Sequence, residues 1–145
     1  MDRVKLFREY TRELEFHLAV LNQSDCCQCG SNESQCFLIV EIGRKAGICV
    51  KELAEIVGLD KSGISRGVEE LVRKGYVNRE PSLEDRRCVV LSLTESGKAR
   101  FDRIENDMYL KFKGVLSQMA PEKQQQVLEA LGIDTEACRK AEQAK

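Results

Sequence analysis

The stretch that decides the fold is VKELAEIVGLDKSGISRGVEELVRKGYVNREPSLEDRRCVVLSLTESGKA, residues 50–99. In its first half, apolar residues recur at spacings of three and four, which predicts two short amphipathic helices. Gly58 is placed to end the first helix as a left-handed cap, and Asp60 is placed to cap the start of the second. Because the first helix ends at Gly58 and the second begins at Asp60, a tight turn joins them. The second helix ends at Gly75.

The second half of the stretch changes its hydrophobic period from about 3.6 residues to about 2. YVNREP (76–81) and CVVLSLT (88–94) are predicted strands, and SLEDRR (82–87) connects them as the loop of a hairpin. Two short helices followed at once by a hairpin make a winged helix-turn-helix. In that arrangement the second helix enters the major groove of DNA and the hairpin reaches along the backbone.

Helices are predicted on both sides of this unit. Residues 3–23 and 33–45 precede it as helices, while Thr94 is placed to cap a long helix after it and Pro121 to begin a final one. The tail after residue 133 fits either a helix or a frayed end. The predicted fold class is therefore mainly α with a small β-hairpin wing (α+β). Two of the helices carry apolar stripes, formed by Phe7, Tyr10, Leu14, Leu18 and Leu21 and by Phe101, Ile104, Met108, Phe112, Val115 and Met119.

Composition bounds the class of protein. The 145 residues fit a single chain unit, and 42% hydrophobic residues are enough to form a core. The formal net charge of −1 argues weakly against nucleic acid, although binding to phosphates depends on local basic patches. No apolar run approaches the roughly 20 residues that span a bilayer, and the charged N-terminus MDRVKLFREYTREL cannot be a signal peptide. We therefore expect a cytoplasmic protein with no membrane partner.

Several pieces of residues 50–99 occur in a fixed order: ELA, then KSGISRGVEELVRKGYVNR, then DRR, then LTESG. Together they resemble the MarR family of bacterial and archaeal transcription regulators. The resemblance implies a homodimer whose helical dimerisation region is residues 1–31 and 95–145, around a DNA-binding winged helix-turn-helix at residues 32–94. It also implies a sequence-specific regulator that is not an enzyme. The regulator would be a repressor on a near-palindromic operator in double-stranded DNA, and a signal would change its affinity.

The start of the second short helix is the part that would enter the groove. Ser62 and Ser65 can bond phosphates or base edges, and Arg66 can pair bidentately with guanine. Gly63 and Gly67 stand where the family usually has larger residues. Either the packed helix tolerates them, or, at Gly63 above all, the missing side chain lets the backbone approach DNA. The candidate DNA contacts of this helix are Lys61, Ser62, Gly63, Ser65 and Arg66.

The hairpin loop crowds Glu84, Asp85, Arg86 and Arg87 together. Positions two apart on a strand share a face, so we expect the Asp85 carboxylate to lie beside the Arg87 guanidinium and hold it in one rotamer. The resemblance assigns this pair to insertion in the minor groove, with Arg86 pointing the other way towards a phosphate or solvent. The alternative is an exposed ion pair on a solvated turn.

The sequence contains seven cysteines, and the MarR family pattern does not require them. Cys26, Cys27, Cys29 and Cys36 lie within the run CCQCGSNESQC, whose spacing differs from that of a zinc ribbon. This cluster could sense oxidants through its thiols, hold zinc or another metal, or have no sensing role. Other family members instead bind small phenolic or anionic effectors. The remaining three, Cys49, Cys88 and Cys138, are expected to be small apolar fillers.

Two other classes of function compete with the regulator. Cys26 and Cys29 form a C-x-x-C, as in thiol-disulfide or metal-handling proteins, but the βαβ context of that chemistry is missing from the sequence pattern. A winged helix used only for protein contacts is the other class, and it would not need Asp85 and Arg87. No nucleophile–base pair, phosphate loop or carboxylate dyad indicates catalysis.

Overall fold

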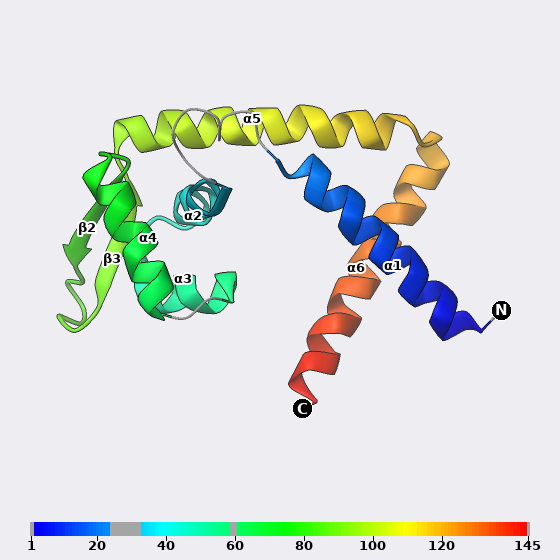
Figure 1. Ribbon diagram of the computed structural model, residues 1–145, viewed down its shortest axis with the longest axis horizontal. Helices are drawn as coiled ribbons and strands as arrows, with labels where there is room; N and C mark the ends of the chain where they lie inside the picture. The colour runs from blue at the N-terminus through cyan, green and yellow to red at the C-terminus, as the bar shows by residue number, and fades with distance from the viewer. Residues whose placement is uncertain (1, 24–32, 59–60, 145) are drawn as a thin grey trace. The chain divides into compact units, whose positions relative to one another are not determined.

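The computed structural model describes residues 2–23, 33–58 and 61–144. This part of the chain is mainly helical, with one antiparallel sheet of three strands (Figure 1). The predicted winged-helix architecture is confirmed. No helix in these ranges is both long and apolar enough to cross a membrane. The elements are α1 (Arg3–Leu21), α2 (Glu33–Arg44), β1 (Ile48–Cys49), α3 (Val50–Val57), α4 (Lys61–Arg73), β2 (Val77–Pro81), β3 (Val89–Leu93), α5 (Glu95–Ser117) and α6 (Pro121–Gln143).

The sheet has β3 in the middle, in the order β1-β3-β2. β2 and β3 form the predicted hairpin, with Val77 opposite Leu93 and Pro81 opposite Val89. β1 is an addition to the prediction, and it pairs Cys49 with Val90 on the other edge of β3. Its two residues are too few to show an alternating pattern, which is why the sequence predicted a hairpin alone.

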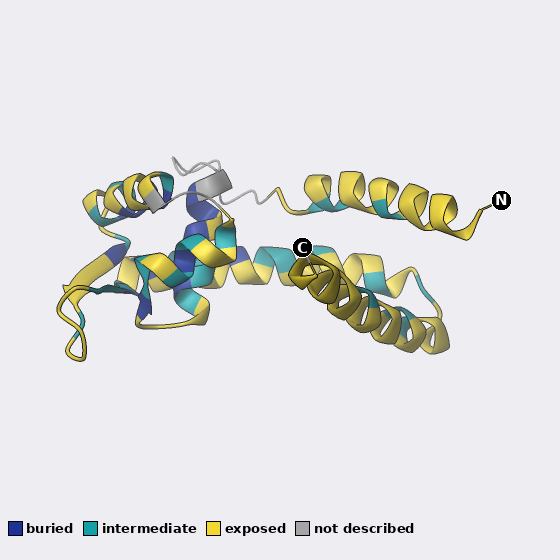
Figure 2. Ribbon diagram, turned by 90° about the horizontal axis from the view of Figure 1, so that it is seen from below, coloured by how far each residue is buried: buried dark blue, intermediate teal, exposed yellow. Residues whose placement is uncertain are grey.

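The core lies where α2, α3 and α4 pack on one another and on the sheet (Figure 2). Leu53 from α3, Ile64 and Leu71 from α4, and Leu91 from β3 are all fully buried. The apolar positions that predicted α3 and α4 are therefore the positions that meet in this core. Burial of each such side chain contributes about 1.5–3 kcal/mol to folding.

Glycines end both short helices, as predicted. Gly58 has φ of +74° and Gly75 has φ of +85°, the left-handed region that favours glycine. Asp60, the predicted cap of α4, lies outside the described residues. Thr94 caps α5 as predicted, because its Oγ1 accepts a hydrogen bond from the Gly97 N–H at 3.0 Å. The same hydroxyl donates to the Gly75 carbonyl at 2.6 Å, so it joins the end of α4 to the start of α5.

Gly67 marks the place where α2 and α4 approach closely. A Cβ at this position would come within 2.7 Å of Leu38 Cδ1 on α2. Glycine costs a helix interior about 1 kcal/mol relative to alanine, and here the cost is offset by close packing of the two helices. Of the two explanations offered for the glycines of α4, packing applies to Gly67.

Gly97, in the first turn of α5, is a stronger case of the same kind. A Cβ there would come within 2.0 Å of the Tyr76 carbonyl oxygen, which is backbone and cannot rotate away. We expect Gly97→Ala to destabilise the fold by about 1–3 kcal/mol in a urea titration. Gly114→Ala is the matched control in the same helix, because a Cβ there meets nothing within 4 Å among the described residues. It should stabilise the chain by up to about 1 kcal/mol. Equal midpoints for both variants would contradict this packing.

Contacts divide the chain into Met1–Tyr109 and Leu110–Lys145. The second unit holds the end of α5 and all of α6, which continues through the tail as a helix. Pro121 begins α6, as predicted. At the corner before it, the Gln124 side-chain amide donates to the carbonyls of Leu116 and Met119, both at 3.0 Å. Gln124 therefore joins the first turn of α6 to the end of α5, where the Leu116 carbonyl also accepts from the Met119 N–H at 3.1 Å.

Candidate nucleic-acid interface

Helix α4 has two distinct faces. Ile64, Val68 and Leu71 are at most 1% exposed and face the core. Ser62, Ser65 and Arg66 are exposed, and their spacing of three and four places them on one stripe of the helix. Gly63 is half-buried beside them, and the side chain of Lys61 lies outside the described atoms. The structure agrees with the prediction that Val68 and Leu71 belong to the core, and contact of the opposite face with DNA stays a prediction.

The basic residues at the far end of α4 are engaged by the protein itself. Arg73 forms an ion pair with Glu70 one turn earlier. Lys74 Nζ donates to Oε1 of the buried Gln35, at 2.8 Å. Arg66 has no ion pair within the described ranges, so its guanidinium is a basic group that the first half of α4 can offer to an anion.

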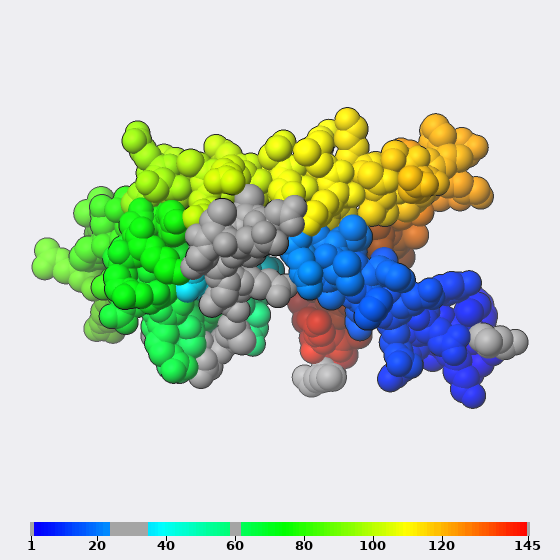
Figure 3. All heavy atoms as spheres, turned by 45° about the horizontal axis from the view of Figure 1, so that its top comes forward, coloured from blue at the N-terminus to red at the C-terminus, as the bar shows by residue number. Residues whose placement is uncertain are grey.

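The wing loop, residues 82–88, is closed by its own hydrogen bonds. Ser82 Oγ accepts from the backbone N–H groups of Glu84 at 3.2 Å and Asp85 at 3.3 Å. The Ser82 N–H donates to the Cys88 carbonyl at 2.9 Å, and the Cys88 N–H donates to the Asp85 carbonyl at 3.0 Å. The loop protrudes from the surface of the winged-helix unit (Figure 3). Sequence reasoning missed Ser82. Serine is nevertheless a common turn residue, because its hydroxyl can bond the backbone N–H groups of residues that follow it.

The expected pairing of the Asp85 and Arg87 side chains is wrong. Residues 83–87 form bends and a turn rather than a strand, so the rule that positions two apart share a face does not apply to Asp85 and Arg87. Asp85 Oδ1 instead accepts from the backbone N–H of Arg87, at 3.0 Å. The carboxylate therefore fixes the backbone from which the arginine side chain extends. Arg86 and Arg87 are both exposed, and Leu83, which sequence reasoning did not single out, is fully exposed beside them.

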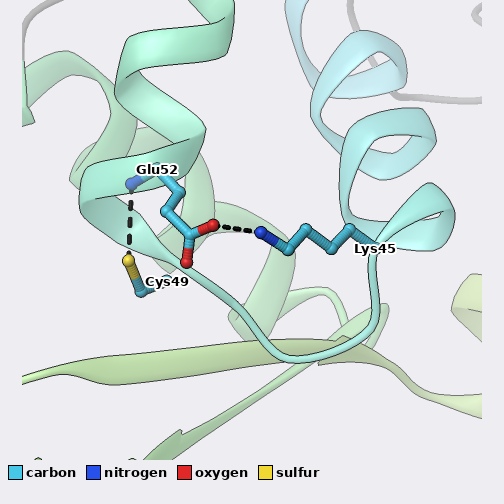
Figure 4. A network of polar contacts seen from close by, with 3 residues as sticks. All are labelled: Lys45, Cys49 and Glu52. Carbon is cyan, nitrogen blue, oxygen red and sulfur yellow. Dashed lines mark hydrogen bonds and ion pairs between the residues drawn. The ribbon is translucent and has the colours of Figure 1, made fainter.

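A polar network holds the start of α3 (Figure 4). Cys49 Sγ accepts from the Glu52 N–H at 3.4 Å, so this cysteine caps the helix. The Glu52 carboxylate pairs with Lys45 from the segment after α2. That bond to the ammonium lowers the pKa of Glu52 below its ordinary value and raises the pKa of Lys45. The expectation that Cys49 is an apolar filler was wrong, because its sulfur bonds a backbone N–H that would otherwise lack a helical partner.

The other cysteines occupy different environments. Cys88 is half-buried at the base of the wing loop, with Sγ 3.6 Å from Asp85 Oδ2. Partial burial, and next the Asp85 charge, raise the pKa of the Cys88 thiol. Cys138 is exposed on α6, with Sγ 3.8 Å from Asp134 Oδ1. Neither is an apolar filler, whereas Cys36, predicted as part of the cluster, is 5% exposed within the core.

The rest of the predicted cysteine cluster, Cys26, Cys27 and Cys29, lies outside the described residues. Among the residues that are described, no group of three or more His, Cys, Asp and Glu side chains is placed to hold a metal ion. His17, the one histidine of the sequence, is exposed and meets the Phe16 ring edge-on, with 5.4 Å between the ring centroids.

Comparisons with known proteins agree with this architecture. Residues 32–89 match the model of the MarR family. The chain is 37% identical over 92 residues to the HTH-type transcriptional regulator YfiV of Bacillus subtilis. This alignment covers 63% of this chain and 58% of that protein. It is 28% identical over 134 residues to the HTH-type transcriptional regulator BilQ of Clostridium symbiosum, covering 90% and 93% of the two chains.

Solved structures give the same result for the fold. Streptococcus pneumoniae FabT, crystallised in complex with DNA, superposes with a TM-score of 0.78 at 19% identity, over 98% of this chain and 99% of that one. The family match covers α2, β1, α3, α4, β2 and the wing loop, and it ends at Val89, the first residue of β3. The part of the chain that holds α4 and the wing loop, residues 32–89, therefore matches the MarR family of winged helix-turn-helix transcription regulators.

Proposed function

We propose that this chain is a homodimeric repressor that binds a near-palindromic operator, with α4 in the major groove and the wing loop at the minor groove. One observation carries the proposal. The face of α4 opposite the core exposes Ser62, Ser65 and Arg66, and the wing loop in the same unit presents Arg86 and Arg87 from a fixed backbone. A helix that fits the groove and a loop that reaches the backbone are the two parts of this docking mode.

Each residue has a separate role in the proposal. Arg66 pairs with guanine, and Ser62 and Ser65 bond phosphates or base edges. Arg87 enters the minor groove and Arg86 contacts a phosphate. Asp85 reduces the ordering cost of this insertion, because its bond to the Arg87 N–H already fixes the local backbone. Lys61 and Gly63 complete the contact surface at the start of α4.

The proposed dimer uses residues 1–31 and 95–145, around the DNA-binding residues 32–94. In the single chain, α1 and α6 contain no buried residue. Each of these helices leaves large apolar side chains exposed, and exposed apolar groups favour association with another copy. The large apolar side chains left exposed are Val4, Leu6, Phe7, Tyr10, Leu14, Phe16 and Val20 on α1, Tyr109, Leu110, Phe112 and Val115 on α5, and Leu128, Leu131 and Ile133 on α6.

The signal that changes DNA affinity has three proposed alternatives: oxidation of Cys26, Cys27 and Cys29, a metal such as zinc at those thiols, or a small-molecule effector. Replacing the three cysteines by serine separates them. A response to oxidant or zinc that disappears in this variant assigns the signal to the cluster. A response that survives in it assigns the signal to another site.

The direct test of the proposed function is fluorescence anisotropy with DNA from upstream of this protein's own gene. Reduced, metal-free protein is expected to bind that DNA at least about 10³-fold more tightly than a scrambled duplex of the same length. Footprinting should show two half-sites one helical turn apart, about 34–36 Å between centres. Equal affinity for both duplexes would contradict sequence-specific binding, and a single protected half-site would contradict the dimer.

A further inference from the structure

Two thiols outside the predicted cluster lie on neighbouring strands. Cys49 ends β1 opposite Val90 of β3. Cys88 lies two residues before Val90, and the bond from the Ser82 N–H to its carbonyl at 2.9 Å continues the hairpin ladder one step beyond Pro81 and Val89. Side chains two residues apart on an extended strand share a face, so Cys49 and Cys88 are diagonal neighbours on one face of the sheet.

Each of these thiols takes part in the DNA-binding unit. Cys49 Sγ caps α3 through the Glu52 N–H. Cys88 Sγ contacts the same Asp85 carboxylate that holds the Arg87 backbone. Both cysteines are half-buried rather than enclosed in the core, so a small oxidant can reach them. A change at this pair therefore acts on the first helix of the helix-turn-helix and on the wing at once.

We propose that Cys49 and Cys88 form a reversible intramolecular disulfide in response to hydrogen peroxide, and that this bridge releases the wing loop from its DNA-binding arrangement. The Cys49 thiolate attacks peroxide and breaks the O–O bond, which leaves a sulfenic acid and hydroxide, and the hydroxide becomes water with the first thiol proton. The Cys88 thiolate then attacks the sulfenic sulfur, the S–S bond forms, and hydroxide leaves as water with the second thiol proton. Two thiols lose two protons and two electrons, and one peroxide is reduced to two waters.

The geometry couples the bridge to the wing. Diagonal neighbours in an antiparallel pair lie about 7–8 Å apart between Cα atoms, whereas a disulfide requires about 4.4–6.8 Å. The backbone must therefore move, and Cys88 can move because it lies outside the paired residues of β1 and β3. Movement of Cys88 breaks its contact with Asp85, and bonding of the Cys49 sulfur removes the cap of α3. The bridge and the arrangement that presents Arg87 exclude one another.

The second chemical step should depend on pH. Three titratable groups act on Cys88: Asp85 in the loop and Cys49 on β1 raise the thiol pKa, and Lys51 on α3 lowers it. With burial as the largest cause, the net result is a raised pKa and a small thiolate fraction at neutral pH. The rate of bridge formation should therefore rise as pH increases through the alkaline range.

The test is peptide mapping of the full chain after peroxide, alkylation of remaining thiols and proteolysis. We expect a peptide pair joined through Cys49 and Cys88, lighter by two hydrogens than the sum of its parts and separated by dithiothreitol. Cys138→Ser should keep this pair, whereas Cys49→Ser and Cys88→Ser should each lose it. Full alkylation of both cysteines after peroxide, or their pairing only with other thiols, would overturn the bridge.

The consequence for the wing rests on the proposed function and is measured separately. Oxidation should weaken operator binding of the wild-type chain at least about tenfold relative to its reduced form. In Cys88→Ser, the oxidised and reduced forms should differ much less in operator affinity. If peptide mapping finds the Cys49–Cys88 disulfide but operator affinity does not change, the proposed effect on the wing loop is overturned. The proposed function would stand in that case. If reduced protein binds no operator, the proposed function fails, and the peptide map still decides whether the bridge exists.

Discussion

Replacing Arg66 and Arg87 together by alanine is expected to weaken operator binding by about 2–6 kcal/mol, from about 1–3 kcal/mol for each contact. The two residues lie on α4 and on the wing loop, and no hydrogen bond or ion pair joins them within the described part of the chain. Their effects should therefore add. Loss of Arg66 should also relax the preference for guanine at one position, because base contacts carry specificity.

Anisotropy titrations of each single variant and the double variant measure these costs. Arg139→Ala is the control, because it removes a positive charge from α6, where the arginine pairs with Glu136. It should leave operator affinity nearly unchanged. The free energies of unfolding of all variants, from urea titrations, should agree within about 0.5 kcal/mol, since Arg66 and Arg87 are exposed. Wild-type affinity in the double variant would remove both α4 and the wing from the mechanism.

Replacing Leu53 by alanine is expected to lower the free energy of unfolding by about 2–5 kcal/mol. Leu53 is fully buried on α3, within the core that holds α4 in position. The substitution removes apolar contacts and leaves a cavity that the surrounding helices fill only in part. Urea titrations at a fixed protein concentration measure the loss, because association in a dimer makes apparent stability depend on concentration.

Leu83→Ala is the matched control for this prediction. Leu83 is fully exposed in the wing loop, so the same chemical change there should alter the free energy of unfolding by no more than about 0.5 kcal/mol. A similar loss of stability in both variants would mean that Leu53 does not occupy the core position described.

Local pattern predicted most of the fold. The apolar spacing of α3 and α4, the left-handed glycines Gly58 and Gly75, and the Thr94 cap each depend on a few neighbouring residues. Those features are visible in sequence because their physical causes are local. β1 was missed because two residues show no period and its pairing with β3 is a tertiary contact.

The site was predicted less completely for the same reason. The exposed side of α4 follows from periodicity, but the Asp85 bond to the Arg87 backbone depends on turn geometry that the strand rule cannot give. The role of Cys49 as a cap was missed because serine, threonine, aspartate and asparagine are the residues expected there. The close approach at Gly67 depends on Leu38, 29 positions earlier in the sequence, and only the fold brings the two together.

Selection of binding sites from a random-sequence DNA pool, by the reduced wild-type protein and by Arg66→Ala in parallel, tests whether α4 reads the operator. We expect the wild-type protein to enrich one near-palindromic site with half-site centres about one helical turn apart. The variant should enrich a site with weakened preference for guanine in each half. A pool with no enriched sequence, or identical sites for both proteins, would contradict the claim that α4 reads the operator.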